Sequence, residues 1–453
     1  MRRTGGPASS STAASWFGIV AAAAILLWPA ILNGYPLLFG DTGVYIKDGN
    51  HIHVTWARPM FYGLFMRPLH LRLTVWPVIA AQGLIAATML QLAVRTFVPA
   101  APRLALIPVT IALALGTSLP WFVSQLMPDV FAGLLVLALA ALTLAPERFG
   151  RIGRLALMLF AAFCITMHLS LLPLCLAALV VLWLARLWLG RGLGAGDLMR
   201  GTAIPLLAVI IITLPNAALL GKVSPSPYGK IFILTRLIAD GPARRVLERE
   251  CPQPDWTLCA FKDELGDNSD AILWGPGEMM RRAGGQDAVV QQAGPIIAAT
   301  LRAEPGAVAL DALRNTAAQF VSFASGDELL KRSPFNDDVW SQEFPAAEQA
   351  RYHAGRQFQL HELIPSWMQA LHIGLGFLSI LFLTVAAWWA MRRREVIGGL
   401  YLVIPAALLA NAFVAGALSG VFDRYQSRLV WLAPFAVLLF LLDRRRAASP
   451  EPA

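Results

Sequence analysis

Residues 33–72, NGYPLLFGDTGVYIKDGNHIHVTWARPMFYGLFMRPLHLR, follow the first long apolar run of the chain and concentrate ionisable side chains beside it. The stretch holds Asp41, Asp48, the histidines His51 and His53 and an Arg-Pro step at Arg58. The whole chain is 57% hydrophobic and only 14% charged. Ionisable groups close to hydrocarbon are costly and usually functional. We therefore take this stretch as the first candidate site, held in place by the apolar runs around it.

The apolar residues of the 453-residue chain form unbroken runs separated by short polar segments, and the mean hydropathy is +0.59. Runs of this length cross the roughly 30 Å of bilayer hydrocarbon as helices. The sequence therefore predicts an all-α fold, a polytopic membrane bundle of about ten helices with a mostly helical cap. The predicted spans are residues 16–32, 75–97, 104–120, 129–145, 154–168, 170–187, 202–220, 369–391, 397–416 and 429–442.

One long polar segment, residues 221–368, interrupts the apolar runs and predicts the cap. Gly, Pro and Asp punctuate it, and helix-like stretches lie between these breaks. The predicted organisation is an N-terminal membrane domain at 1–220 with a first outer loop at 33–74, the cap at 221–368 and C-terminal membrane helices with a short tail at 369–453. The helix-like stretches of the cap are near 229–250, 278–303 and 306–324.

Two of the four cysteines, Cys251 and Cys259, lie in the predicted cap. They would close a small ring if oxidised, as is common in a periplasm or another oxidising exterior. Two free thiols are the alternative. The other two cysteines, Cys164 and Cys175, lie in apolar runs, and the four show no zinc-binding spacing.

The formal net charge is +9 and the pI is about 9.8. The arginines stand in short clusters between apolar runs, without the basic face of a nucleic-acid-binding protein, so no nucleic acid is expected as a partner. Most Lys and Arg residues of the short loops fall on one side of the predicted membrane, which the positive-inside rule makes cytoplasmic. Both termini are then cytoplasmic, and residues 33–72 and the cap face outward.

In that orientation, polar residues from distant parts of the chain fall at one depth on the outer side. They are Asp41, Arg58, Asp129, His168, Asp423, Arg424 and Arg428. Unpaired charges near hydrocarbon cost several kcal/mol, so a common depth indicates a common site. The alternative is that loop ends are simply where charges occur, with Arg424 and Arg428 extending toward lipid headgroups.

Asp41 is the candidate catalytic group. Gly40 and Gly43 flank it in FGDTGVY and let the backbone approach a ligand closely. Partial burial would raise the pKa of the carboxyl toward working pH and suit it to act as a general base. The alternative is a helix N-cap, with the Asp41 side chain accepting from the amides of Gly43 and Val44.

Histidines near this stretch make a divalent cation the possible cofactor. His51 and His53 would point to one side of an extended segment, and His168 with Asp129 could complete a set of nitrogen and oxygen ligands. Nothing in the spacing brings the four together, so no metal ligand is assigned.

The order of these features resembles the GT-C class of polytopic glycosyltransferases. The resemblance rests on an apolar first helix, the early Asp-Thr-Gly-x-Tyr at Asp41, RPMFYGLF beginning at Arg58, further spans and a soluble outer segment. It covers roughly the first 130 residues, with weaker similarity at Asp129 and in DRYQSR. Thr42 replaces the second acid of the Asp-Glu pair that some members carry, and the Trp-Trp-Asp signature of oligosaccharyltransferases is missing.

The resemblance implies transfer of a sugar from a polyprenyl-phosphate carrier to a glycolipid, glycan or protein acceptor at the periplasmic face of a bacterial cytoplasmic membrane. It implies Asp41 as catalytic base. Cations would stabilise the leaving phosphate, and guanidinium groups suit this role. The expected phosphate-binding residues are Arg58, Arg424, Arg428 and Lys230, with Arg236 as a further choice. The expected site-lining residues are Tyr45, Tyr62, Asp129, His168 and Tyr425.

Two other functions fit the same composition. A transporter or flippase for lipid-linked saccharides would also need arginines and an apolar groove, but transporters carry ionisable groups near mid-membrane, whereas here the spans are nearly free of charge. The second alternative is a non-enzymatic assembly protein whose cap binds a partner. On that hypothesis Asp41 can be replaced without loss of activity.

Overall fold

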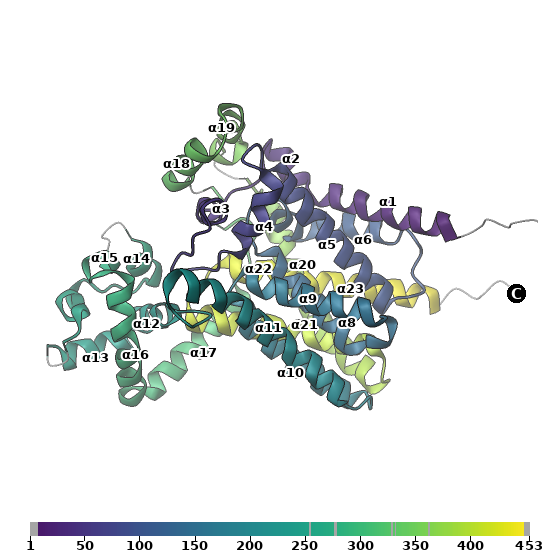
Figure 1. Cartoon of the computed structure of the whole chain (residues 1–453). Coiled ribbons are helices and arrows are strands. Elements are labelled where there is room, and N and C mark those ends of the chain that lie inside the picture. The colour runs from purple at the N-terminus through teal and green to yellow at the C-terminus, as the bar shows by residue number, and fades with distance from the viewer. Residues whose placement is uncertain are drawn as a thin grey trace, which may run out of the picture.

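The computed structural model describes residues 8–252, 255–275, 279–327, 329–330, 332–360 and 363–447, and its regular elements in these ranges are helices (Figure 1). The predicted all-α fold is confirmed. Within this part of the chain, six helical segments are long and apolar enough to cross a membrane, which indicates a multi-pass membrane protein. They are α5 (Trp76–Phe97), α10 (Leu171–Trp188), α11 (Ala195–Leu220), α20 (Ser366–Arg392), α21 (Val396–Leu418) and Asp423–Arg444, which joins α22 (Asp423–Val430) to α23 (Leu432–Ala447).

Of the other four predicted spans, three form shorter apolar helices and the fourth, 154–168, lies in the 17-residue α9 (Arg151–Met167), so the count of about ten is not reached by helix length. The first run breaks at Leu27, because α1 (Ala8–Leu26) ends there and α2 (Trp28–Asn33) begins with a proline in its first turn. The run at 104–120 breaks where Thr117 is extended, between α6 (Leu106–Gly116) and α7 (Leu119–Val123). Apolar composition does not reveal such breaks.

The centre of the bundle is α8 (Val130–Leu144), in which every residue is buried. It packs against α5, α10, α21 and α9 (Arg151–Met167). A helix that is apolar on all sides is expected in such a position. Gly133 lets the Trp431 indole lie against the helix, since a Cβ at Gly133 would be 2.3 Å from that ring. Asp129, just before α8, is thereby held inside one end of the bundle, roughly 22 Å from Leu144.

The predicted cap region divides into two parts. One part lies at an end of the bundle around an apolar core of its own (Figure 1) and consists of α12 (Gly229–Asp240), α13 (Pro242–Glu250), α14 (Ser269–Trp274), α15 (Met279–Arg282) and α16 (Gly285–Ala303). The other part joins the membrane helices: α17 (Pro305–Val321) packs along α21, and α18 (Pro334–Glu343), followed by α19 (Ala346–His353), packs on the first loop.

Two details of the cap test the sequence predictions. The helix expected at 229–250 is broken at Gly241, where φ is +105°. A disulfide joins Cys251 to Cys259, as the oxidised alternative predicted, while Cys164 and Cys175 are free and buried. The disulfide closes a small ring immediately after α13.

The candidate stretch folds into α3 (Thr42–His51) and α4 (Phe61–His70), which cross at two glycines. A Cβ on Gly49 would lie 2.2 Å from the carbonyl oxygen of Gly63, and a Cβ on Gly63 would lie 2.2 Å from that of Tyr45. Only glycine allows backbones to approach this closely. The crossing fixes the loop between the helices, which carries Arg58, against the start of α3, which carries Asp41.

We expect Gly63→Ala to separate α3 from α4 and destabilise the protein by about 1–3 kcal/mol, as overpacking of a close contact does. The measurement is the thermal unfolding of the detergent-solubilised protein. The control is Gly153→Ala in α9, where the added methyl meets its nearest atom, Phe149 Cβ, at an ordinary 3.5 Å. Equal melting temperatures for the two variants would contradict this account of the crossing.

Candidate functional site

Asp41 and Arg58 form an ion pair across the α3–α4 loop, with Nη1 of Arg58 2.8 Å from Oδ1 of Asp41. Asp41 stands at the N-cap position of α3, but its side chain makes no capping hydrogen bond. The Gly43 amide donates instead to the side-chain oxygen of Asn336 in α18, at 2.8 Å. The N-cap interpretation is therefore wrong, and the Asp41 carboxylate is turned toward Arg58.

The environment of Asp41 combines dense packing with access to solvent. Its side chain is 31% exposed, whereas that of Arg58 is 13% exposed. Burial raises the pKa of the Asp41 carboxyl, but the guanidinium groups of Arg58 and Arg424 lower it by more, so the pKa of Asp41 lies below its ordinary value. The expectation of a raised pKa is wrong for this form of the site, because it considered burial without the neighbouring cations. Asp41 is ionised at neutral pH.

Arg424, in α22, is buried at 8% exposure and is not extended toward headgroups. Its guanidinium carbon lies 3.9 Å from the centre of the Phe39 ring, a cation–π arrangement. Within the described part of the chain, its Nη1 is buried without a hydrogen-bond partner. A buried guanidinium with a free donor is expected to attract an anion, because an unsatisfied buried donor is costly.

The Arg424 side chain lines a small recess together with Ser118, Gln125, Asp327 and Ser427. The recess has a cavity volume of only about 10 Å³, room for about one water molecule. Pockets for small molecules usually hold roughly 300–1,000 Å³. The recess in this form is therefore too small for a sugar or its carrier.

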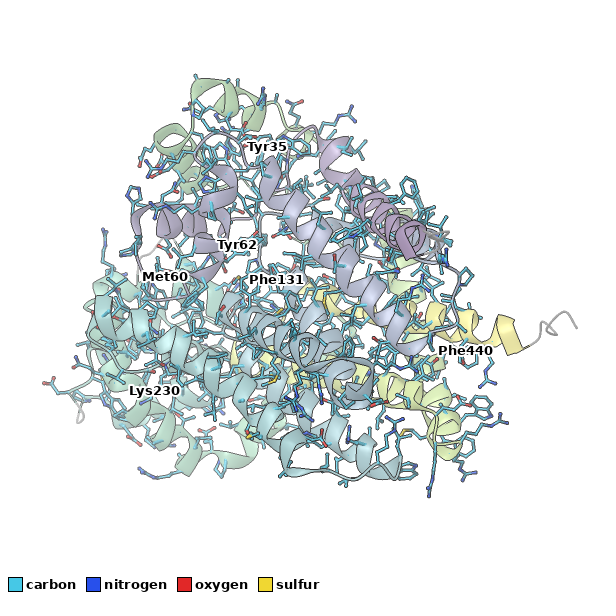
Figure 2. The ribbon with its side chains drawn as sticks, turned by 45° about the vertical axis from the view of Figure 1, so that its right-hand side comes forward. Tyr35, Met60, Tyr62, Phe131, Lys230 and Phe440 are labelled. Atoms are coloured by element: carbon cyan, nitrogen blue, oxygen red, sulfur yellow. A yellow bond between two sulfur atoms is a disulfide. The ribbon has the colours of Figure 1, made fainter. Side chains whose placement is uncertain are left out.

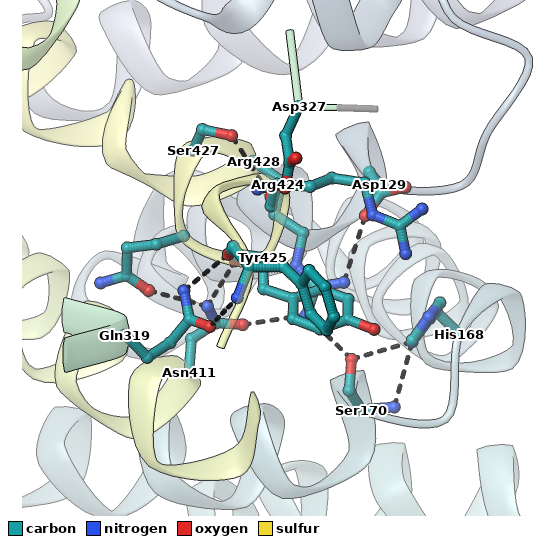
Figure 3. A network of polar contacts seen from close by, with 12 residues as sticks. Asp129, His168, Ser170, Gln319, Asp327, Asn411, Arg424, Tyr425, Ser427 and Arg428 are labelled. Atoms are coloured by element: carbon teal, nitrogen blue, oxygen red, sulfur yellow. Dashed lines mark hydrogen bonds and ion pairs between the residues drawn. The ribbon is translucent and has the colours of Figure 1, made fainter. Parts of the chain in front are cut away.

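Arg428, one turn further along α22, is 1% exposed and makes three side-chain hydrogen bonds to protein groups (Figure 3), while its Nε is buried without a partner among the described residues. It donates to Oδ1 of Asp129 at 3.2 Å, to Oγ of Ser170 at 3.0 Å and to the side-chain oxygen of Asn411 at 2.9 Å. These partners belong to three segments of the bundle, so Arg428 joins α22 to its neighbours. Neither headgroup contact nor direct phosphate binding fits a guanidinium enclosed in this way.

His168 and Tyr425 border this network. The Nδ1 of His168 accepts from the Ser170 backbone N–H at 3.3 Å and lies 2.8 Å from the Ser170 hydroxyl, which also accepts from Arg428. The Tyr425 ring lies 5.1 Å from the guanidinium carbon of Arg424 and 5.5 Å from that of Arg428. Both residues are therefore placed with the arginines, as the sequence predicted.

Two buried tyrosines lie next to Arg58: Tyr45 packs against its guanidinium group, and Tyr62 packs against Tyr45. The guanidinium carbon of Arg58 lies 5.5 Å from the centre of the Tyr45 ring, and the Tyr45 and Tyr62 rings meet edge to face at 5.1 Å. Tyr62 also donates to Oε1 of Gln82 in α5, at 2.6 Å (Figure 2 shows its position). Both side chains are almost fully buried, so Tyr45 supports Arg58 and Tyr62 supports Tyr45.

Two predicted cations remain outside this group. Lys230 is exposed on α12, with its ammonium group beside Gly294 of α16 (Figure 2). Arg236 pairs with Asp240 four residues along the same helix. Both lie on α12 of the cap, and among the described contacts none joins either residue to Asp41.

The histidines of the first loop diverge instead of forming a cation site. His51 pairs with Glu343 of α18 at 2.5 Å, while His53 pairs with the buried Asp48 at 3.1 Å. Ile52, between them, has a φ of +51°, so the segment is not extended as the prediction assumed. In the described ranges, no group of three or more His, Cys, Asp or Glu side chains is arranged to hold a metal ion.

Three supporting amides were not singled out in the sequence. Gln82 and Asn411 interrupt predicted membrane helices, and a polar residue in an apolar run is a usable signal. Asn336 holds the start of α3 through the Gly43 amide and the Phe39 carbonyl, but it lies in a polar segment where an asparagine is ordinary. Only the fold reveals its role.

Comparisons of the chain with protein-family models, curated proteins and solved structures gave no match. The resemblance to GT-C glycosyltransferases therefore depends on the residue pattern. The geometry of Asp41, Arg58 and Arg424 has to be judged on its own chemistry.

We expect Arg428→Met to destabilise the protein by about 3–5 kcal/mol, because it leaves the Asp129 carboxylate buried without its cation. Adding Asp129→Asn should recover a substantial part of that loss, since it removes the stranded charge. The measurement is a double-mutant cycle on thermal unfolding in detergent. Arg314→Met removes an exposed partner of Asp311 and should change stability by less than about 1 kcal/mol. Strictly additive losses at Asp129 and Arg428 would contradict a coupled pair.

Proposed function

We propose that the chain is a membrane glycosyltransferase of GT-C type, which moves a sugar from a polyprenyl-phosphate carrier to an acceptor hydroxyl. The observation that carries this proposal is the accessible Asp41 carboxylate, 2.8 Å from Arg58 and within the electrostatic influence of Arg424. A carboxylate that accepts a proton beside cations that bind a leaving phosphate is the minimum set for this reaction.

In the proposed reaction the acceptor oxygen attacks the anomeric carbon from the face opposite the phosphate. The new carbon–oxygen bond forms as the bond from carbon to the phosphate oxygen breaks, which inverts the configuration. Asp41 takes the hydroxyl proton, and the electron pair leaves on the polyprenyl phosphate. Arg58 and Arg424 stabilise the negative charge as it develops on the phosphate.

The Asp41–Arg58 ion pair also suggests how binding of the sugar donor raises the basicity of Asp41. A phosphate that draws Arg58 away from Asp41 removes a group that lowers the pKa of the carboxyl, while burial persists. Asp41 then becomes a stronger base when the donor is present. The recess beside Arg424 must widen to admit the sugar, and Ser325, Gly326 and Asp327 form part of its wall.

The proposed topology places this site at the periplasmic face of a bacterial cytoplasmic membrane, with both termini inside. The distribution of short-loop arginines supports it, as does the disulfide in the cap, because disulfides persist in oxidising compartments. About ten crossings result if the shorter apolar segments also traverse the bilayer within the bundle. The acceptor class is a glycolipid, glycan or protein hydroxyl.

We expect Asp41→Asn to reduce sugar transfer by roughly 10²–10⁴-fold, the usual contribution of a general base. The assay uses membranes with matched expression and polyprenyl-phosphate sugars, scored for sugar released from the carrier and bound to acceptor. The control is Asp197→Asn, which removes a carboxylate paired with Arg186 and Arg200 beside Thr143, near the opposite end of α8. That variant should retain transfer.

Equal transfer by the wild type and Asp41→Asn would remove Asp41 from the mechanism. Movement of a lipid-linked saccharide across the membrane without transfer would favour the transporter or flippase alternative. These two outcomes are separated by following the lipid and the sugar with different labels in the same vesicles.

The lowered pKa of Asp41 predicts the pH dependence of transfer. The carboxyl is ionised above its folded-state pKa, which lies below the ordinary value of about 3.9. For free enzyme, kcat/KM should therefore show no loss from Asp41 protonation between roughly pH 5 and 7. Arg58→Gln should move the acid limb of kcat/KM to higher pH, because burial then acts against a weaker cationic field. An acid limb at the same pH in both proteins would contradict the coupling.

A further inference from the structure

The first outer loop is attached to the cap through a tryptophan. Residues 53–60, between α3 and α4, form no helix or strand and carry both Trp56 and Arg58. Although Trp56 belongs to the loop, its partly buried side chain packs against the apolar core of the cap. The segment between the two helices is therefore held by the cap at Trp56 and by Asp41 at Arg58.

Three aromatic rings of the cap contact the Trp56 indole. It stacks on Trp274, the last residue of α14, with ring centres 5.0 Å apart, and on Phe232 of α12, at 5.6 Å. The Tyr228 ring, just before α12, meets it edge to face at 6.3 Å. Aromatic pairs in such arrangements stabilise a contact beyond the burial of their apolar surface. Trp56 is therefore a fixed point of the loop.

Arg58 lies only two residues beyond this fixed point. Two residues of chain reach at most about 7 Å, so a fixed Trp56 confines the backbone of Arg58 to a small region. Pro59 follows, and a proline disfavours the α conformation of the residue before it. The position of Trp56 is therefore passed to Arg58 through a backbone with little freedom.

The described side-chain contacts of Arg58 come from α3 and its start, not from the cap. Its guanidinium pairs with Asp41 at 2.8 Å and lies over the Tyr45 ring at 5.5 Å. A donor phosphate that draws Arg58 from Asp41 would weaken the first of these contacts. The aromatic contacts of Trp56 do not involve the ion pair, so they would still keep Arg58 beside the site.

We propose that Trp56 is a positioning residue through which the cap holds Arg58 beside Asp41. Among the described contacts none joins Trp56 to Asp41, and Trp56 acts through the backbone of Arg58. The catalytic consequence rests on the proposed transfer function, whereas the placement of Arg58 is measured without it. The cap then takes part in the site although its own cations, Lys230 and Arg236, have no described contact with Asp41.

The test is the rate at which phenylglyoxal modifies Arg58 in the detergent-solubilised full chain, measured by peptide mass spectrometry. In the wild type the Arg58 side chain is 13% exposed and paired, so its modification should be slow. Trp56→Ala removes the aromatic contacts with the cap and should speed the modification roughly tenfold. Trp56→Phe keeps an aromatic ring against the cap and should restore most of the protection of Arg58.

The matched control is Trp256→Ala. The Trp256 side chain is also partly buried against the cap core, but no described ring contact joins it to Trp56. This variant should leave Arg58 modification at the wild-type rate. A wild-type rate in Trp56→Ala, or an equal acceleration in Trp256→Ala, would overturn the proposal.

Trp274→Ala keeps the proposal testable if Trp56→Ala does not fold. It truncates a side chain that is 49% exposed and weakens the hold on Trp56 from the side of the cap. The modification of Arg58 should then be roughly threefold faster than in the wild type. An unchanged rate in this variant would count against the anchor.

Sugar transfer provides a second readout that a purely structural role of Trp56 would not change. Trp56→Ala should move the acid limb of kcat/KM to higher pH, as Arg58→Gln does, and adding it to Arg58→Gln should move the limb no further. Additive shifts would show that Trp56 acts by another route. Wild-type membranes without transfer would contradict the proposed function, while the modification rate of Arg58 would still decide whether the cap positions it.

Discussion

The buried ion pair between Asp129 and Arg428 is the constraint on which this structure depends most. Both side chains are 1% exposed at one end of a bundle whose central helix is wholly apolar. Desolvating two charges is expensive unless they are paired and further hydrogen-bonded, and Ser170 and Asn411 supply those extra bonds. Helices α8, α21 and α22 must therefore meet at this point, which also sets the position of Arg424.

Arg424 and Arg428 differ in hydrogen bonding, which indicates a structural role for Arg428 and a ligand-binding role for Arg424. Arg428 donates to three protein groups and leaves only Nε without a partner, whereas no described hydrogen bond comes from the side chain of Arg424, one turn earlier, whose Nη1 is buried without a partner and whose guanidinium stacks on Phe39. A protein gains no stability from leaving a buried donor unsatisfied. The unfavourable free energy of the unsatisfied donor of Arg424 is explained if an anion binds there. The accessible Asp41 carboxylate nearby is the group that would react next to that anion.

Much of the fold could be predicted from the sequence, because long apolar runs and their polar boundaries report directly on burial. The helical class and the grouping of Asp129, His168, Arg424 and Arg428 at one end of the bundle followed from such patterns. Helix lengths were not predicted, since apolar composition alone does not locate the breaks at Leu27 and Thr117. The pKa of Asp41 was expected in the wrong direction because the sequence does not give distances to its neighbours.

The basic residues of this chain differ in role according to whether their charges have partners in the protein. Lys230 and Arg236, plausible phosphate ligands by sequence, belong to the cap, and Arg236 has a carboxylate partner there. At the other end of the bundle, Arg393 and Arg444 stack on the Trp389 ring, and Arg444 also pairs with Glu395 at 3.6 Å, although its Nε is buried without a hydrogen-bond partner among the described residues. The charge count of the chain treats all these residues alike. Their pairing distinguishes them, because the free energy of a buried or interfacial cation is set by its partners.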